Sequence, residues 1–149
     1  MISKSKDTKI ICIFAPKTKC ETMKTKKQIV GSRGEEEACL WLIGQGHRIL
    51  RRNWRASHLE LDIITIRGRT IHIVEVKTRS GDTPVAPESK VDYLKRQRLV
   101  RAAGAFMNDS LRGSLPADVE VQFDVLTVVF EEPEPRIQYF PQAFIPMYF

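Results

Sequence analysis

The sequence predicts an α/β fold in which helices flank a mixed β-sheet, with elements in the order αβββαβ. Three observations support this class: two segments have apolar residues at helical spacing, strand-like apolar runs lie between them, and another such run follows the second helix. The chain has 149 residues, of which 42% are hydrophobic and 28% are charged. It is therefore long enough for one ordinary domain with a substantial core.

The first helix is predicted from about Gly31 to Gly44, where apolar residues recur at helical spacing. Ser32 is a candidate N-cap, and the three glutamates at positions 35–37 would complement the helix dipole in the first turns. A Gly-Gln-Gly sequence then ends the helix, and residues 47–54 are predicted to form a strand.

The next two strands form a predicted β-hairpin between Leu59 and Lys77. A two-residue turn at Gly68-Arg69 would pair the residues on either side of it. Counting back along both strands then places Asp62 opposite Glu75, and alternation places Lys77 on the same face as Glu75.

Two carboxylates that face each other in this way repel unless positive charge lies between them, because directly opposed Cβ atoms are roughly 4.5–5.5 Å apart. A divalent cation with the adjacent Lys77 ammonium meets that requirement. Oxygen ligands favour Mg²⁺ or Mn²⁺, which polarises phosphate and lowers the pKa of bound water. Asp62 and Glu75 are therefore predicted metal ligands. The alternative is a purely structural role, in which Lys77 forms an ion pair with either acid at a sheet edge.

The second half of the chain contains a second helix and further strands. The apolar face of this helix is predicted to contain Val91, Leu94, Leu99, Ala102, Ala103 and Phe106. Its other face carries Lys95, Arg96, Arg98 and Arg101. Residues 119–130 are predicted to form a strand, and a short strand is expected at residues 137–140 after a Pro-rich turn.

The formal charge of +6 arises from the N-terminal region, since residues 1–30 hold eight lysines against two acids and the remaining residues are neutral overall. Residues 1–28 are predicted to be a basic, mobile extension, and residues 29–149 a single domain. Within that domain, residues 47–101 carry thirteen Lys and Arg against six acids. This local charge suits a polyanionic substrate, although a solvated surface would have the same composition.

Several functional classes are disfavoured by composition. Cys12, Cys20 and Cys39 are odd in number and form no CxxC pair, so neither a disulfide framework nor a zinc ribbon is indicated. The three histidines lack metal-ligand spacing, and His72 should point to the sheet face opposite Glu75. No apolar run approaches the roughly 20 residues of a membrane span, so a cytoplasmic location and no membrane partner are expected.

An ordered series of short motifs resembles the YraN-like family of small bacterial predicted endonucleases. These motifs are Gly31-Ser32-Arg33-Gly34-Glu35 with Ala38, Asn53, Glu60-Leu61-Asp62, Val74-Glu75-Val76-Lys77-Thr78-Arg79, Lys95 with Ala102-Ala103, and Phe123-Asp124-Val125. The resemblance covers about residues 28–144. Proteins of this family are similar to archaeal Holliday junction resolvases and have the restriction-endonuclease-like fold, so the resemblance implies that fold here.

The resemblance also implies roles for individual residues. Asp62 and Glu75 would bind Mg²⁺ or Mn²⁺, and the Val76 carbonyl would add a ligand. Lys77 would orient water or stabilise phosphorane charge. Glu35 would be an additional catalytic acid at the metal site, whereas sequence alone indicates only a glutamate that complements the helix dipole.

The remaining candidates have two readings each. Glu60 shares the face of Asp62 by alternation and is either an outer or alternative ligand or an exposed acid at the strand end. Arg79, Lys95 and Arg98 are candidate nucleic-acid contacts, or else solvated charges of a loop and a helix.

Two positions depart from the family pattern. Leu59 stands where the family usually has glycine, and Gln122 stands where it usually has arginine. Leucine adds bulk where glycine permits close approach, so access near Asp62 is expected to differ.

The leading hypothesis is a metal-dependent endodeoxyribonuclease, with branched DNA as the substrate and a homodimer as the assembly that the resemblance implies. The rival from another class is a non-catalytic nucleic-acid-binding or adaptor protein with the same fold. An RNA-directed nuclease is a third hypothesis. Because nothing in the residues reads the 2′-hydroxyl, a direct comparison of DNA and RNA substrates is what would separate it.

Overall fold

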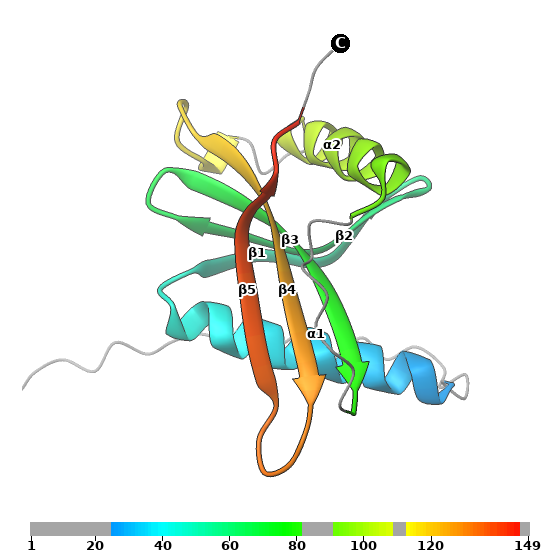
Figure 1. Cartoon of the computed structure of the whole chain (residues 1–149). Coiled ribbons are helices and arrows are strands. Elements are labelled where there is room, and N and C mark those ends of the chain that lie inside the picture. Colours follow the sequence, from blue (N-terminus) through cyan, green and yellow to red (C-terminus); the bar gives the residue numbers. More distant parts are fainter. Residues whose placement is uncertain (1–24, 82–90, 109–112, 147–149) are drawn as a thin grey trace, which may run out of the picture.

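The computed structural model describes residues 25–81, 91–108 and 113–146, in which one five-stranded sheet is combined with two helices (Figure 1). The elements are α1 Lys26–Gly44, β1 Arg48–Ala56, β2 Leu59–Arg67, β3 Thr70–Ser80, α2 Tyr93–Met107, β4 Glu120–Phe130 and β5 Arg136–Phe144. This architecture confirms the predicted α/β class and fits a restriction-endonuclease-like fold.

The strands lie in the sheet in chain order, β1-β2-β3-β4-β5. Strands β3 and β4 are parallel, whereas the other neighbours are antiparallel, so the sheet is mixed as predicted. Parallel neighbours need a long crossover, and α2 lies within the connection between β3 and β4. This connection brings α2 back toward the β2–β3 hairpin that carries the predicted metal ligands.

The sheet separates two apolar cores, one under each helix. Ile64 belongs to the core that includes the buried face of α2, and its neighbour Ile63 belongs to the core that includes Ala38 and Leu42 of α1. Successive residues of a strand point to opposite faces. The two helices therefore cover opposite faces of the sheet.

Helix α1 begins earlier than the sequence predicted. Thr25 is its N-cap, and Thr25 and Gln28 form a reciprocal capping box, with the Thr25 N–H donating to Gln28 Oε1 at 2.9 Å. The proposed cap at Ser32 is therefore wrong, and the glutamates at 35–37 lie beyond the first turn. The helix also takes in residues 26–28, which had been assigned to the extension.

Two further details of the prediction need correction. Val91 precedes α2 and Leu94 is 60% exposed, so the buried face of this helix consists of Leu99, Ala102, Ala103 and Phe106. The last strand is also longer than expected, because β5 pairs with β4 over most of its length and extends to Phe144. The element order is therefore αβββαββ.

A network of polar groups lies on the α1 face of the sheet around Asp124 of β4, which is 1% exposed. His72 Nδ1 lies 2.7 Å from Asp124 Oδ2, and the Tyr139 hydroxyl donates to the same oxygen. Gln122 Nε2 and the Gln142 N–H donate to Oδ1 at 2.8 and 2.9 Å. Both carboxylate oxygens are thus hydrogen-bonded from within the protein, and Gln122 belongs to this network.

Candidate metal centre

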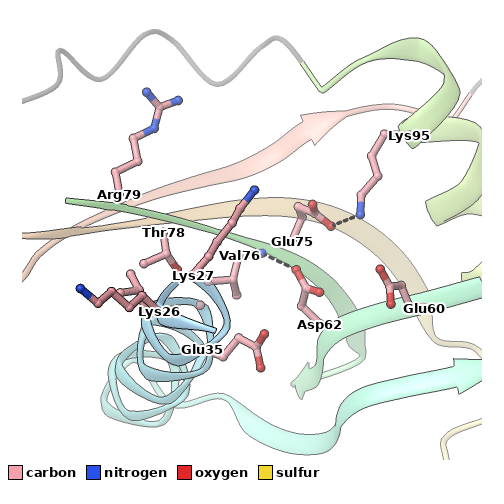
Figure 2. A pocket seen from close by; sticks show the side chains of 12 residues that line it. Lys26, Lys27, Glu35, Glu60, Asp62, Glu75, Val76, Thr78, Arg79 and Lys95 are labelled. Atoms are coloured by element: carbon pink, nitrogen blue, oxygen red, sulfur yellow. Dashed lines mark hydrogen bonds and ion pairs between the residues drawn. The ribbon is translucent and has the colours of Figure 1, made fainter. Parts of the chain in front are cut away.

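A cleft of about 840 Å³ lies between α1, α2 and the β2–β3 hairpin (Figure 2). The residues that line it are Lys26, Lys27, Val30, Gly31, Glu35, Glu60, Asp62, Glu75, Val76, Thr78, Arg79 and Lys95. Most of the predicted site residues are therefore brought together in one place.

The hairpin places Asp62 and Glu75 as the sequence predicted. The pairs Arg67↔Thr70 and Ile63↔Val74 lie in one continuous antiparallel register, and one further step brings Asp62 level with Glu75. At that point the side chain of Asp62 replaces the backbone as acceptor, because the Val76 N–H donates to Asp62 Oδ2 at 2.9 Å. This bond fixes one carboxylate oxygen beside Glu75.

Glu75 is only 7% exposed, and its nearest charged partner comes from α2. Lys95 Nζ lies 3.1 Å from Glu75 Oε2. Apart from this ion pair, Oε2 has no hydrogen-bond partner among the described residues. The Glu75 carboxylate is therefore compensated by one ammonium from α2 and not by a set of backbone or side-chain donors.

Burial and mutual repulsion act on both carboxyl groups. Burial raises the pKa of Asp62 above its ordinary value, and the Val76 N–H and the Lys95 ammonium only partly offset this effect. Burial also raises the pKa of Glu75, to which the negative charge of Asp62 adds, while Lys95 opposes both. Without a cation, the fully ionised pair is therefore disfavoured.

Glu35 reaches the cleft from α1 because that helix approaches β3 closely. Gly34 lies against Thr78, and a Cβ at position 34 would collide with the Thr78 side chain. Glu35 is held in turn by Asn53 of β1, whose Nδ2 donates to Glu35 Oε2 at 2.9 Å. Figure 2 shows the Glu35 carboxylate reaching from the helix toward the side of the cleft that contains Asp62.

Lys77 and Glu60 occupy two different positions around the acidic pair. Lys77 is half-buried, and its positive charge lowers the pKa of both Asp62 and Glu75, although it is not among the described residues that line the cleft. Glu60 lines the cleft but has an exposed side chain, 3.5 Å from Arg55. Its negative charge raises the pKa of Asp62.

Of the three predicted nucleic-acid contacts, two line the cleft and one does not. Arg79 and Lys95 line the cleft, whereas Arg98 is an exposed residue of α2 that is not among the described lining residues. Lys95 also pairs with Glu75, a contact that the sequence did not predict.

Two lysines and one asparagine at the site were missed as site residues. Lys26 and Lys27 line the cleft from the first turn of α1, but sequence analysis assigned them to the extension. The Thr25-Lys26-Lys27-Gln28 capping box was a signal that could have placed them on a helix. Asn53 appeared only as part of the family resemblance, and no local pattern indicated its contact with Glu35.

The residues present fit a magnesium-like ion in part. Within the described part of the chain, no three His, Cys, Asp or Glu residues lie close enough together to form a complete ligand set. Mg²⁺, however, usually retains several waters and is held by one or two carboxylates together with substrate phosphates. Asp62 and Glu75 match such a site, and Glu35 lines the same cleft.

Two other expectations concern the remainder of the chain. No helix among the described residues is both long and apolar enough to cross a membrane. Cys39 is a buried free thiol, whereas Cys12 and Cys20 lie outside the described residues.

Comparison with known proteins gives a consistent result. The family model of the uncharacterised protein family UPF0102 matches residues 34–128. A UPF0102 protein of Bacteroides thetaiotaomicron is 42% identical over 120 residues, which cover 80% of this chain and 95% of that protein. A UPF0102 protein of Parabacteroides distasonis is 37% identical over a region that covers 77% of this chain and 91% of that protein. A UPF0102 protein of Oleidesulfovibrio alaskensis is 45% identical over a region that covers 71% of this chain and 52% of that protein.

Proposed function

The chain belongs to the uncharacterised protein family UPF0102, and we propose that it is a metal-dependent endonuclease that hydrolyses DNA phosphodiesters. The observation that carries this proposal is the pair formed by Asp62 and Glu75, two carboxyl groups that face each other in the cleft and have raised pKa values despite the nearby Lys95 ammonium. A pair of this kind in a cleft is typical of a site that takes up a cation.

In the proposed mechanism, Asp62 and Glu75 hold Mg²⁺ or Mn²⁺, and the Val76 carbonyl is a further candidate ligand. When bound, such an ion polarises the phosphate and supplies an activated water. Asp62 is held for this task by the Val76 N–H. The Lys77 ammonium, whose charge acts on both acids, would orient water or stabilise the negative charge that develops on the phosphate.

The lining of the cleft supports a polyanionic substrate. Lys26, Lys27, Arg79 and Lys95 all line it, together with the acids. Cations in this position would attract phosphates along a nucleic-acid backbone and hold it beside the metal ligands. Branched DNA as the substrate and a homodimer as the assembly are suggested by the resemblance to Holliday junction resolvases.

Two observations favour the rival function of a non-catalytic DNA-binding or adaptor protein. Lys95 already supplies a positive charge to Glu75, and the described residues include no complete three-residue ligand set. In that case the cations of the cleft would bind DNA without cleaving it. Such binding would be sensitive to salt but indifferent to metal and to Asp62→Asn.

The deciding experiment is a cleavage assay with labelled four-way junction, flap, single-stranded and duplex DNA, and matched RNA, with Mg²⁺, Mn²⁺ or a chelator. We expect metal-dependent cleavage by the wild type. Asp62→Asn should reduce its rate by at least about 100-fold, since a charged ligand of the activating cation is lost, and Lys77→Ala should abolish it.

The matched control for this assay is Glu36→Gln, which removes an exposed acid of the same domain and should retain wild-type cleavage. DNA binding by all variants without any cleavage would support the rival function. Cleavage of RNA alone would redirect the proposal to an RNA nuclease, and the preferred DNA would identify the substrate class.

A further inference from the structure

Asn53 has an unusual backbone conformation beside the candidate metal centre. Its φ is +49°, in the left-handed region that few residues other than glycine adopt, although asparagine is among the more tolerant. Its neighbours Arg52 and Trp54 pair with Ile63 and Leu61, so Asn53 lies level with Asp62 on the adjacent strand. Such conformations persist where the surrounding structure requires them, and they cluster at functional sites.

The side chain of Asn53 connects this edge strand to helix α1. Asn53 Nδ2 donates to Glu35 Oε2 at 2.9 Å, while Asn53 itself is exposed. An exposed hydrogen bond contributes little to folding, because water replaces it easily. Its consequence is instead to select one orientation of the Glu35 side chain, which otherwise has several rotatable bonds.

The orientation of the Glu35 side chain matters because Glu35 lines the same cleft as Asp62 and Glu75 (Figure 2). The bond to Asn53 uses one carboxylate oxygen of Glu35 and leaves the other for a cation or for a water bound to it. Mutation of groups that orient metal ligands in this way typically lowers metal affinity by about 10–100-fold.

We propose that Asn53 is a positioning residue, which fixes the Glu35 carboxylate at the edge of the metal site and thereby strengthens binding of a divalent cation. This inference rests on the proposed function, since it assumes that the cleft binds a cation. It adds a role for the β1 strand, which contributes no acid to the cleft.

The test is direct Mn²⁺ binding by isothermal titration calorimetry, in the absence of DNA. Asn53→Gly removes the amide and retains freedom for the left-handed backbone, and we expect it to weaken Mn²⁺ binding by about tenfold. Ser57→Gly is the matched control, because Ser57 is also an exposed residue with positive φ, +53°, and should bind Mn²⁺ like the wild type.

A double-mutant cycle separates positioning from a general structural effect. If Asn53 acts through Glu35, adding Asn53→Gly to Glu35→Ala should change Mn²⁺ affinity by less than about twofold. Wild-type affinity in Asn53→Gly, or a full tenfold loss that persists in the Glu35→Ala background, would overturn the role of Asn53.

The same titration keeps this inference distinct from the proposed function. A wild-type protein that binds no Mn²⁺ would overturn the metal site itself. A protein that binds Mn²⁺, shows the Asn53 effect and yet leaves every nucleic acid intact would uphold the positioning role and contradict nuclease activity.

Discussion

The sheet carries buried carboxyl groups on both faces. The Asp62–Glu75 pair lies on one face and Asp124 on the other, and their surroundings differ. Burial opposes ionisation of Asp124, yet hydrogen bonds from His72, Tyr139, Gln122 and Gln142 outweigh it and lower its pKa. At Glu75, burial and the charge of Asp62 dominate, and the pKa is raised. The two residues are similarly buried, with exposed fractions of 1% for Asp124 and 7% for Glu75. The difference in pKa therefore comes from the number of hydrogen-bond donors around each carboxylate.

This contrast separates a structural acid from a candidate functional one. Asp124 receives all its stabilisation from groups within the fold. Apart from its ion pair with Lys95, Glu75 Oε2 has no hydrogen-bond partner among the described residues, and the positive charges of Lys95 and Lys77 do not offset the rise in its pKa. A carboxylate that the protein leaves incompletely satisfied can gain free energy from an external cation, whereas a saturated one has little to gain.

The largest expected effect is on stability, from Asp124→Ala. Its removal would leave the buried His72 and the partly buried Tyr139 and Gln122 without their acceptor, so we expect the free energy of unfolding to fall by about 3–5 kcal/mol. Urea denaturation followed by circular dichroism measures this change. Glu131→Ala is the control, since its ion pair with Arg136 is at the surface and should contribute less than about 1 kcal/mol. An equal decrease in the free energy of unfolding for Asp124→Ala and Glu131→Ala would show that Asp124 is not a structural acid.

The pH dependence of stability should have opposite signs at the two sites. Because the pKa values of Asp62 and Glu75 are raised on folding, their ionisation destabilises the metal-free fold increasingly as pH rises above the ordinary carboxyl value of about 4. Asp124, with its lowered pKa, contributes stability that is present above that value and lost only as pH falls through its folded pKa.

Urea denaturation from pH 4 to pH 7 with a chelator would test this difference. The stability advantage of the Asp62→Asn/Glu75→Gln variant over the wild type should grow as pH rises. The comparison cancels the shared titration of His47, whose pKa is lowered to about 4 by burial. A difference that does not change with pH would show that the cleft acids are not destabilised by ionisation.

The smallest expected change in stability is that of Glu75→Gln at pH 7 without metal. Glutamine retains the shape and removes a disfavoured charge, and Lys95, whose side chain is 31% exposed, can turn toward water. We expect a change within about 1 kcal/mol, together with loss of metal-dependent cleavage. Thermal denaturation and the cleavage assay measure the two effects. Destabilisation comparable to that of Asp124→Ala would instead make Glu75 a structural acid.

Local sequence was sufficient to predict the core of the site. The Gly68-Arg69 turn sets the hairpin register, and strand alternation then places Asp62 level with Glu75, because both effects depend on neighbouring residues alone. The same alternation correctly placed His72 on the face opposite Glu75, where it contacts Asp124. The start of α1 was missed because its capping box lies within a lysine-rich stretch.

Other features depend on tertiary structure, since they join segments that only packing brings together. Lys95 meets Glu75 because α2 returns to the hairpin, and Asn53 meets Glu35 because α1 lies beside β1. The sequence by itself determined which carboxylates face each other, through turn geometry and the two-residue period of a strand. Only the packing of the helices on the sheet decided which cations and donors reach those carboxylates, and therefore whether the pKa of each acid is lowered or raised in the fold.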